Sequence, residues 1–209
     1  MTVLVIDIGD TKYGQYSIPL IQRLCDYSKL NLVVLKDDIN ENYKQLHPSW
    51  LKLLCHDIID DDFIVCWDLD LLPCNLYDIK PFFDLTKINL AFDTGNYFGK
   101  SYFNEKFKYN CGLIGIPKSE SWFFKSIYHD FIPEMSPNYP SFEQYHVNDR
   151  LFDEEKLVNE LPLEMNYLFN RYNLESSLSN PVLNVHYTSW HLQSESERIE
   201  LIKTHHALF

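Results

Sequence analysis

The chain contains the stretch Asp62-Phe63-Ile64-Val65-Cys66-Trp67-Asp68-Leu69-Asp70-Leu71-Leu72-Pro73. The apolar run Phe63–Trp67 predicts a buried β-strand, which Asp68 and Asp70 follow directly. In open α/β sheets ligands bind at the carboxyl ends of strands, where these two carboxylates fall. If the chain stays extended, both point to the same side and repel each other unless a cation lies between them. Hard oxygen ligands suit Mg²⁺ or Mn²⁺, so the pattern indicates a metal site; a solvated acidic turn is the alternative.

The segments around this strand predict an alternating α/β fold. Thr2–Ile8 and Leu30–Leu35 are β-like apolar runs, and Ser17–Lys29 between them carries apolar residues at helical spacing. This strand–helix–strand order is typical of a parallel sheet. Further strands are expected at Ile88–Phe92, Cys111–Ile116 and Val182–His186, and further helices at Ser49–Ile59, Ser119–Phe131, Phe142–Phe152 and Glu195–His206. Because the sequence contains no linker, repeat or low-complexity segment, residues 1–209 are expected to form a single domain.

The net charge restricts the possible partners. The 209 residues include 18 Lys+Arg and 30 Asp+Glu, so the formal charge is 18 − 30 = −12. Nucleic acids and anionic membranes are bound by clustered cations, which this chain lacks, so both are disfavoured. A small anionic ligand is still allowed where a divalent cation reverses the local sign of the charge.

Cysteine and glycine usage narrow the class of protein further. Five cysteines without a Cys-x-x-Cys pair indicate free, mostly buried thiols in a reducing compartment rather than a zinc site. We see neither a signal peptide nor a stretch of ~20 apolar residues, so a cytoplasmic location without membrane insertion is expected. With six glycines in the chain, neither a P-loop nor a Gly-x-Gly-x-x-Gly motif is present.

The Asp-x-Asp strand, followed by Leu76–Ile79, resembles the nucleotide-sugar-dependent glycosyltransferases of the GT-A fold. It is most similar to glycosyltransferase family 8, the group of glycogenin and the bacterial galactosyltransferases. The similarity spans about residues 3–191, and its other segments are Asp10–Tyr13, Lys52, Leu90–Asp93, Phe107–Ile114, Glu143–Asn148, Leu161–Tyr167 and Val185–Tyr187. The resemblance implies a single α/β domain of the GT-A (Rossmann-like) type, with a central mixed, mostly parallel sheet flanked by helices.

The resemblance also implies an activity and its residues. The activity is transfer of a hexose-type sugar from a nucleoside-diphosphate donor, with UDP as the nucleotide, to a saccharide or other hydroxyl acceptor. Gln144 is implied beneath the anomeric carbon, with Glu143 and Asp93 as further catalytic residues. The implied metal ligands are Asp68, Asp70 and His186, and the one imidazole among oxygens favours Mn²⁺ over Mg²⁺. The implied donor-binding residues are Asp7, Thr11, Tyr13, Lys52, Asp68, Leu69, Asn110, Trp190 and His191. Retention of stereochemistry is implied too, although other GT-A enzymes invert by using a carboxylate base.

The end of the chain departs from the family pattern. Family 8 members have His-x-x-Gly-x-x-Lys-Pro-Trp there, with the Lys on the diphosphate, whereas this chain reads His186-Tyr187-Thr188-Ser189-Trp190-His191. His191 is a candidate replacement for that Lys. The family's usual Asp is also replaced by Glu143. Packing roles are the alternatives for Tyr13 and His186, and a strand-end cap is the alternative for Asn110.

Three other functions share parts of these patterns. A haloacid-dehalogenase-like phosphatase also uses Asp-x-Asp after a strand, but normally on the first strand. Asp7–Lys12 is similar to the Asp-Ile-Gly-Gly-Thr-Lys phosphate turn of actin-like sugar kinases, with Asp10 in place of the second Gly. A GT-A module that binds a nucleotide without turnover is the third, and the absent C-terminal Lys favours it.

Overall fold

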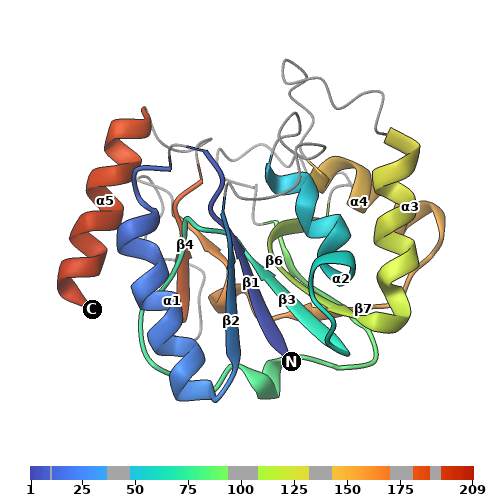
Figure 1. Ribbon diagram of the computed structural model, residues 1–209, viewed down its shortest axis with the longest axis horizontal. Helices are drawn as coiled ribbons and strands as arrows, with labels where there is room; N and C mark the ends of the chain where they lie inside the picture. The colour runs from blue at the N-terminus through green and yellow to red at the C-terminus, as the bar shows by residue number, and fades with distance from the viewer. Residues whose placement is uncertain (10, 37–47, 94–107, 132–142, 170–180, 189–193) are drawn as a thin grey trace.

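The computed structural model describes residues 1–9, 11–36, 48–93, 108–131, 143–169, 181–188 and 194–209 (Figure 1). Its strands are β1 (Thr2–Ile6), β2 (Asn31–Leu35), β3 (Phe63–Trp67), β4 (Leu71–Pro73), β5 (Ile88–Phe92), β6 (Tyr109–Pro117), β7 (Val158–Leu161), β8 (Tyr167–Leu168) and β9 (Asn184–His186). Its α-helices are α1 (Gly14–Ser28), α2 (Cys55–Ile58), α3 (Ser121–Phe131), α4 (Glu143–Asp153) and α5 (Glu195–Leu208). Short 3₁₀ helices are η2 (Pro48–Leu54), η3 (Lys80–Phe82), η5 (Lys118–Glu120) and η7 (Leu163–Met165).

A six-stranded sheet with the order β2-β1-β3-β6-β5-β7 forms the centre of the described chain. The pairs β1–β2, β1–β3 and β5–β7 are parallel, whereas β6 is antiparallel to both β3 and β5. The predicted mixed, mostly parallel sheet is therefore confirmed. Because β6 runs against its neighbours, its amino end lies beside the carboxyl ends of β3 and β5.

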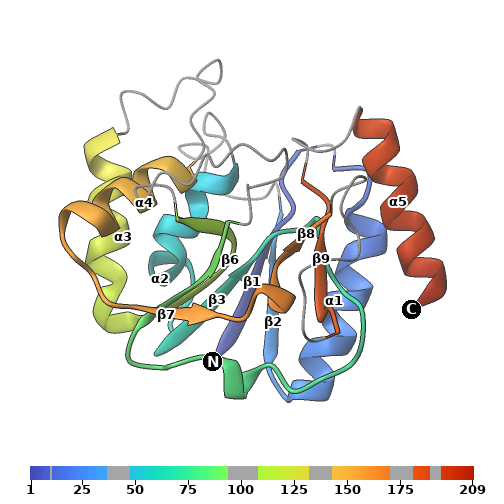
Figure 2. The same cartoon turned by 180° about the vertical axis from the view of Figure 1, so that it is seen from behind.

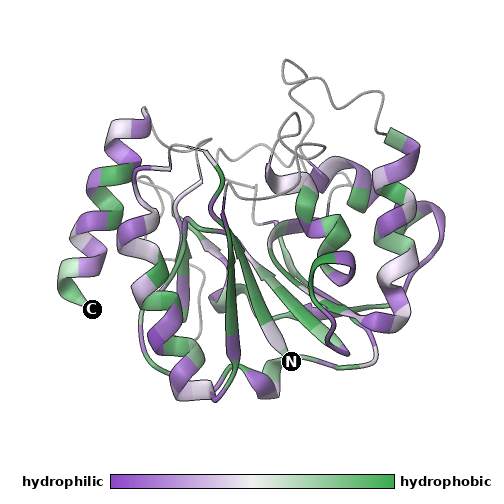
Figure 3. Ribbon diagram, in the orientation of Figure 1, coloured by the Kyte–Doolittle hydropathy of each residue, from purple (hydrophilic) through white to green (hydrophobic). Residues whose placement is uncertain are grey.

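Both faces of this sheet are covered by helices (Figures 1 and 2). Alternate residues of β3 point to opposite faces. Val65 and Trp67 belong to the apolar cluster that includes α1, and Ile64 and Cys66 belong to the cluster that includes η2 and α3. The strands are correspondingly apolar, whereas the helices carry hydrophilic residues as well (Figure 3). The fold is thus a three-layer α/β structure.

A second, three-stranded sheet with the order β4-β9-β8 lies beside α1 (Figure 2). In it β4 pairs antiparallel with β9, so that Leu71 lies opposite His186. The sequence analysis missed β4, β7 and β8. β4 and β8 have three and two residues, too few to show a hydrophobic period, and both pair with a partner distant in sequence.

The predicted helix Ser49–Ile59 is wrong in its first half. The chain forms the 3₁₀ helix η2 there and becomes α-helical only in α2. All five residues from Trp50 to Leu54 are buried, including Lys52. An α-helical amphipathic stripe would bury one face only, so burial on all sides explains the difference.

Two other sequence-based expectations concern composition. All five cysteines are free, and Cys25, Cys55, Cys66 and Cys111 are buried, as predicted. Among the described residues, no helix has both the length and the apolar character needed to cross a membrane.

Candidate active site

The two carboxylates of the Asp-x-Asp sequence leave β3 in a tight turn. The amide of Leu71 donates to the carbonyl of Asp68 at 3.0 Å, so the chain reverses here and is not extended as assumed from the sequence. The amide of Tyr187 donates to the carbonyl of Asp70 at 2.9 Å. The turn therefore places both carboxylates beside β9 and its last residue, His186. The Leu69 side chain between them is buried in the apolar core, so only its backbone is available to a donor.

Asp68, Asp70 and His186 form a compact group of potential metal ligands. Their ligand atoms all lie within 4.8 Å of one another. His186 Nε2 is 3.1 Å from Asp70 Oδ1 and 3.8 Å from Asp68 Oδ2. Around an ion with bonds of about 2.1 Å, neighbouring ligands stand about 3 Å apart and opposite ligands about 4 Å apart. The donor set and its spacing thus fit an octahedral Mn²⁺ or Mg²⁺ ion.

The three side chains differ in exposure. The side chain of Asp68 is 28% exposed, that of Asp70 13% and that of His186 5%. The open side of the group is therefore at Asp68, where a bound ligand can approach.

Lys52 lies behind Asp68 and is buried. Its ammonium contacts the Asp68 carboxylate, lies 2.9 Å from Glu143 Oε1, and donates to the Cys111 carbonyl at 2.9 Å. These three partners use all three of its protons. In this arrangement no proton of Lys52 is left for a phosphate, so its assignment as a donor contact stays a prediction. The family resemblance drew attention to Lys52, but nothing in the sequence indicated that this lysine would be buried.

The charges of this group determine the protonation of its members. Burial raises the pKa of Asp68 to about 6, although Lys52 opposes that effect. Burial also acts to raise the pKa of Asp70, but the neighbouring His186 outweighs burial and holds this pKa below its usual range. In the same way Lys52 holds the pKa of the buried Glu143 below its usual range. Burial acts to lower the pKa of His186, and Asp70 more than compensates, so it is raised overall. Each carboxylate of the cluster therefore has a basic side chain beside it.

An irregularity in β6 shapes the adjoining part of the site. Leu90 pairs with Ile114, but Ala91 pairs with Asn110, so residues 111–113 of β6 form a bulge against β5. Such bulges are frequent beside active sites because they redirect side chains and backbone groups. Here the bulge presents the amide of Cys111 to Gln144 Oε1 at 3.0 Å and the carbonyl of Gly112 to the Asp68 amide at 2.8 Å.

Gln144 and Asp93, both predicted catalytic residues, lie together. Gln144 Nε2 donates to Asp93 Oδ2 at 2.8 Å, while its Oε1 accepts the Cys111 amide. Glu143, the third predicted catalytic residue, lies elsewhere. It is 3% exposed and its carboxylate pairs with the buried Lys52, so its catalytic role stays a prediction.

Arg198, on the first turn of α5, is a site residue that the sequence analysis missed. Its Nη1 donates to Asp70 Oδ2 at 3.1 Å, and its Nη2 contacts Glu195. Its guanidinium carbon also lies 4.9 Å from the ring centre of Tyr13, which is 8% exposed. The capping box of Ser194 and Glu197 indicated the helix, and its observed cap is the Ser194 hydroxyl accepting the Glu197 amide at 3.2 Å. Nothing in that pattern indicated that Arg198 would turn inward.

Asp7, Thr11 and Tyr13, three further predicted donor residues, lie between β1 and α1. The Thr11 hydroxyl contacts the Asp7 carboxylate, and the Asp7 amide donates to Leu35 at 2.8 Å. Gly14 lies against this carboxylate, since a Cβ there would stand 2.8 Å from both of its oxygens. Trp190 and His191 lie outside the described residues, so their assignments stay predictions.

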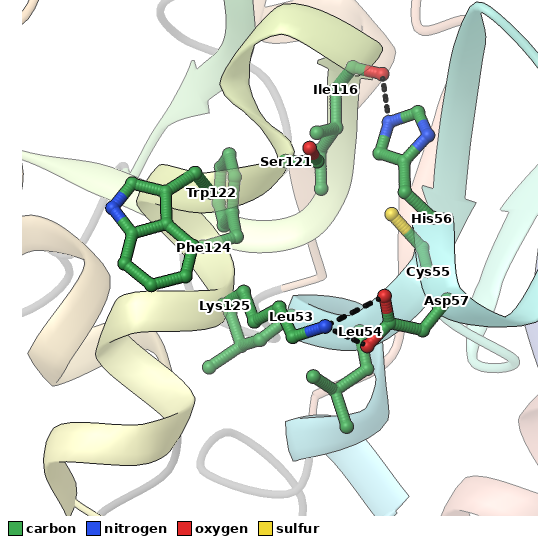
Figure 4. Close-up of a pocket in the computed structure, with 10 residues that line it drawn as sticks. All are labelled: Leu53, Leu54, Cys55, His56, Asp57, Ile116, Ser121, Trp122, Phe124 and Lys125. Carbon is green, nitrogen blue, oxygen red and sulfur yellow. Dashed lines mark hydrogen bonds and ion pairs between the residues drawn. The ribbon is translucent and has the colours of Figure 1, made fainter.

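A separate cavity of about 210 Å³ lies between α2, α3 and β6 (Figure 4). Lys125 and Asp57 form an ion pair at 2.7 Å at its edge, and His56 Nε2 lies 3.1 Å from the Ile116 carbonyl. Ile116 pairs with Ile64, near the amino end of β3. Since Asp68 follows the carboxyl end of that strand, this cavity is not part of the candidate active site.

Solved structures of glycosyltransferases share this fold. A glycosyltransferase involved in glycosylation of the major capsid of PBCV-1 matches with a TM-score of 0.69 and 15% identity, over 98% of this chain and 100% of that one. The galactosyltransferase LgtC, in complex with donor and acceptor sugar analogues, matches with a TM-score of 0.68 and 13% identity, over 100% and 96%. GlyE of Streptococcus pneumoniae TIGR4 matches with a TM-score of 0.61 and 17% identity, over 98% and 60%.

No protein-family model matches the sequence, and a search of curated proteins found no match. The predicted resemblance to GT-A glycosyltransferases is thus confirmed for the fold, which at these identities is what the comparisons show.

Proposed function

We propose that residues 1–209 form a metal-dependent glycosyltransferase domain. It moves a hexose-type sugar from a nucleoside-diphosphate donor, with UDP as the nucleotide, to a saccharide or other hydroxyl acceptor, with retention. The observation that carries the proposal is the Asp68–Asp70–His186 group at the carboxyl edge of a sheet with a glycosyltransferase fold. A buried lysine behind the group and an arginine beside it support the same function.

The site residues would handle the negative charge of the leaving diphosphate. When bound, Mn²⁺ or Mg²⁺ supplies Lewis-acid stabilisation of that charge. Asp68, Asp70 and His186 would hold the ion, and Lys52 keeps Asp68 in place through its buried contacts. In this proposal Arg198 contacts the diphosphate in place of the Lys that the family pattern has near its end. Its guanidinium lies beside Asp70 and suits a bidentate contact with phosphate.

The donor sugar and base would lie on either side of this charge. We assign the sugar to Gln144 and Asp93, whose mutual hydrogen bond fixes the Gln144 amide. The uridine would lie near Asp7, Thr11 and Tyr13. Arg198 lies 4.9 Å from the Tyr13 ring, so a base stacked on that side requires Arg198 to move toward the phosphates.

A donor screen tests the proposal. The protein is incubated with a panel of nucleotide sugars and Mn²⁺, and the released nucleoside diphosphate is measured with and without saccharide acceptors. We expect slow donor hydrolysis, which Asp70→Ala should abolish. Asp78→Ala is the control, because the Asp78 side chain is exposed, and it should hydrolyse the donor as wild type does. Binding without turnover would favour the inert nucleotide-binding module instead. Hydrolysis of small phosphate esters that is lost in Asp68→Asn would favour the phosphatase.

The role of Arg198 has its own test. Arg198→Met should weaken UDP binding in the presence of Mn²⁺ about 10-fold or more, because it removes a charge-assisted contact. Arg23→Met is the matched control, since Arg23 also lies over an aromatic ring, that of Phe209 at 4.9 Å, but is exposed on α1. Equal UDP affinity in wild type and Arg198→Met would remove Arg198 from the site.

A further inference from the structure

A row of buried polar side chains leads from β6 to the potential metal ligand His186. The amide of Gly112 donates to Asn110 Oδ1 at 2.8 Å. Asn166 Nδ2 donates to the same oxygen at 2.7 Å, and Asn166 Oδ1 lies 2.9 Å from His186 Nδ1. Asn110, Asn166 and His186 are 6%, 1% and 4% exposed. At this burial the bonds are shielded from competing water, so their directions have consequences for the imidazole.

The direction of every bond in the row follows from the backbone. A backbone amide can only donate, so the Asn110 atom that faces Gly112 must be its oxygen. Asn166 meets that oxygen and must present its NH₂ group there. The other end of the Asn166 amide is then an oxygen, which can only accept. His186 Nδ1 must therefore carry a proton.

We infer that Asn166 is a positioning residue that makes His186 a metal ligand through Nε2. The inference rests on the metal site of the proposed function. A neutral imidazole has one protonated nitrogen and one free lone pair. With the proton held on Nδ1 by Asn166, the lone pair is on Nε2, the atom that faces Asp68 and Asp70.

The competing arrangement is visible in the same site. Asp70 Oδ1 lies 3.1 Å from His186 Nε2 and accepts a proton from it whenever one is there. Without an acceptor at Nδ1, this carboxylate favours the tautomer with the proton on Nε2, which has no lone pair for a metal. Asn166 and Asp70 therefore compete for the one proton of the neutral imidazole: Asn166 favours it on Nδ1, and Asp70 favours it on Nε2.

The row also changes the interpretation of Asn110. Its Oδ1 already accepts from both Gly112 and Asn166, which uses both lone pairs. The resemblance implied that Asn110 binds a donor hydroxyl. With both lone pairs in use, this oxygen has none left for such a hydroxyl. Asn110 acts on the site by orienting Asn166.

Metal titration of two asparagine variants tests the inference. Mn²⁺ is titrated by calorimetry, without nucleotide, into wild type, Asn166→Leu and Asn184→Leu. Asn184 is the matched control because it is 0% exposed and its side chain hydrogen-bonds to Met165 and Tyr77. We expect Asn166→Leu to bind Mn²⁺ about 10–100-fold more weakly, as for other partners of metal-ligating histidines. Asn184→Leu should lose stability but bind Mn²⁺ as wild type does.

A spectroscopic measurement on the unmodified sequence tests the same claim where Asn166→Leu does not fold. Protein with ¹⁵N-labelled histidine is saturated with Mg²⁺, a diamagnetic ion, and His186→Gln assigns the resonances. A proton on Nδ1 and none on Nε2 is the expected result. A proton on Nε2 in the metal-bound protein, or equal Mn²⁺ affinity in wild type and Asn166→Leu, overturns the inference alone. Absence of Mn²⁺ and Mg²⁺ binding by wild type overturns the proposed metal site and this inference together.

Discussion

Replacement of Lys52 by methionine removes a buried cation while keeping most of the side-chain volume. Lys52 is 4% exposed and its ammonium bonds to Asp68, Glu143 and the Cys111 carbonyl. The side chain of Glu143 is equally buried, at 4%, so Lys52→Met leaves its charge without that partner, whereas the side chain of Asp68 keeps 28% exposure. Removal of one partner of a buried ion pair costs about 3–5 kcal/mol, and most of that cost here comes from Glu143.

Equilibrium unfolding in urea measures this loss. Ordinary domains have a stability of about 5–15 kcal/mol, so all but the least stable of them stay folded after such a change. With an m-value of about 2 kcal/mol/M, the unfolding midpoint should fall by about 1.5–2.5 M at pH 7. Lys118→Met is the control, because Lys118 pairs with Asp60 on the surface and its removal should leave the midpoint unchanged.

A double variant separates the lost ion pair from lost packing. Lys52→Met combined with Glu143→Gln removes the uncompensated carboxylate together with the cation. The two changes should be less than additive by about 1 kcal/mol or more, since residues in one ion-pair network are coupled. Wild-type stability in Lys52→Met, or strict additivity in the double variant, would refute the role assigned to this network.

Further predictions concern the metal ligands and β6. Burial raises the pKa of Asp68 to about 6, and despite its burial the carboxylates raise the pKa of His186. Both groups must lose a proton to bind a metal, so Mn²⁺ affinity should fall as the pH drops through the raised pKa of His186 and then through about pH 6. A flat calorimetric profile would contradict this. Gly112→Ala places a Cβ 2.6 Å from His186 Nδ1; it should destabilise the protein by about 1–3 kcal/mol in urea and weaken Mn²⁺ binding. Gly115→Ala is its control, because that Cβ meets Phe63 and Phe83 at 2.8 Å and should cost stability without changing Mn²⁺ affinity.

The central strands could be predicted from the sequence because their signal is local. Phe63–Trp67 and Ile88–Phe92 were predicted with the bounds that β3 and β5 have. These strands are buried almost throughout, so apolar residues dominate them, with Asn89 of β5 as the polar exception. The last helix was marked by its capping box, which also depends only on neighbouring residues.

The site could be predicted only in part, because its details depend on contacts distant in sequence. Asp68 and Asp70 were indicated by their place after an apolar strand. The inward turn of Arg198 depends on Asp70, 128 residues away. The function of Lys52 depends on Glu143, 91 residues away, and that of Asn166 on a bond to Asn110, 56 residues away. No periodicity or short motif records such pairs.

Titration of UDP into the protein, with and without Mn²⁺, tests the proposed function most directly. The Asp68 carboxylate is at the open side of the site and Asp70 lies next to it, so without a divalent ion the pair should repel a diphosphate. We predict calorimetric UDP binding that requires Mn²⁺ and that Asp70→Ala abolishes while the urea unfolding transition stays cooperative. UDP binding that is absent with Mn²⁺, or unchanged by removal of the ion or of the Asp70 carboxylate, would contradict the proposed function.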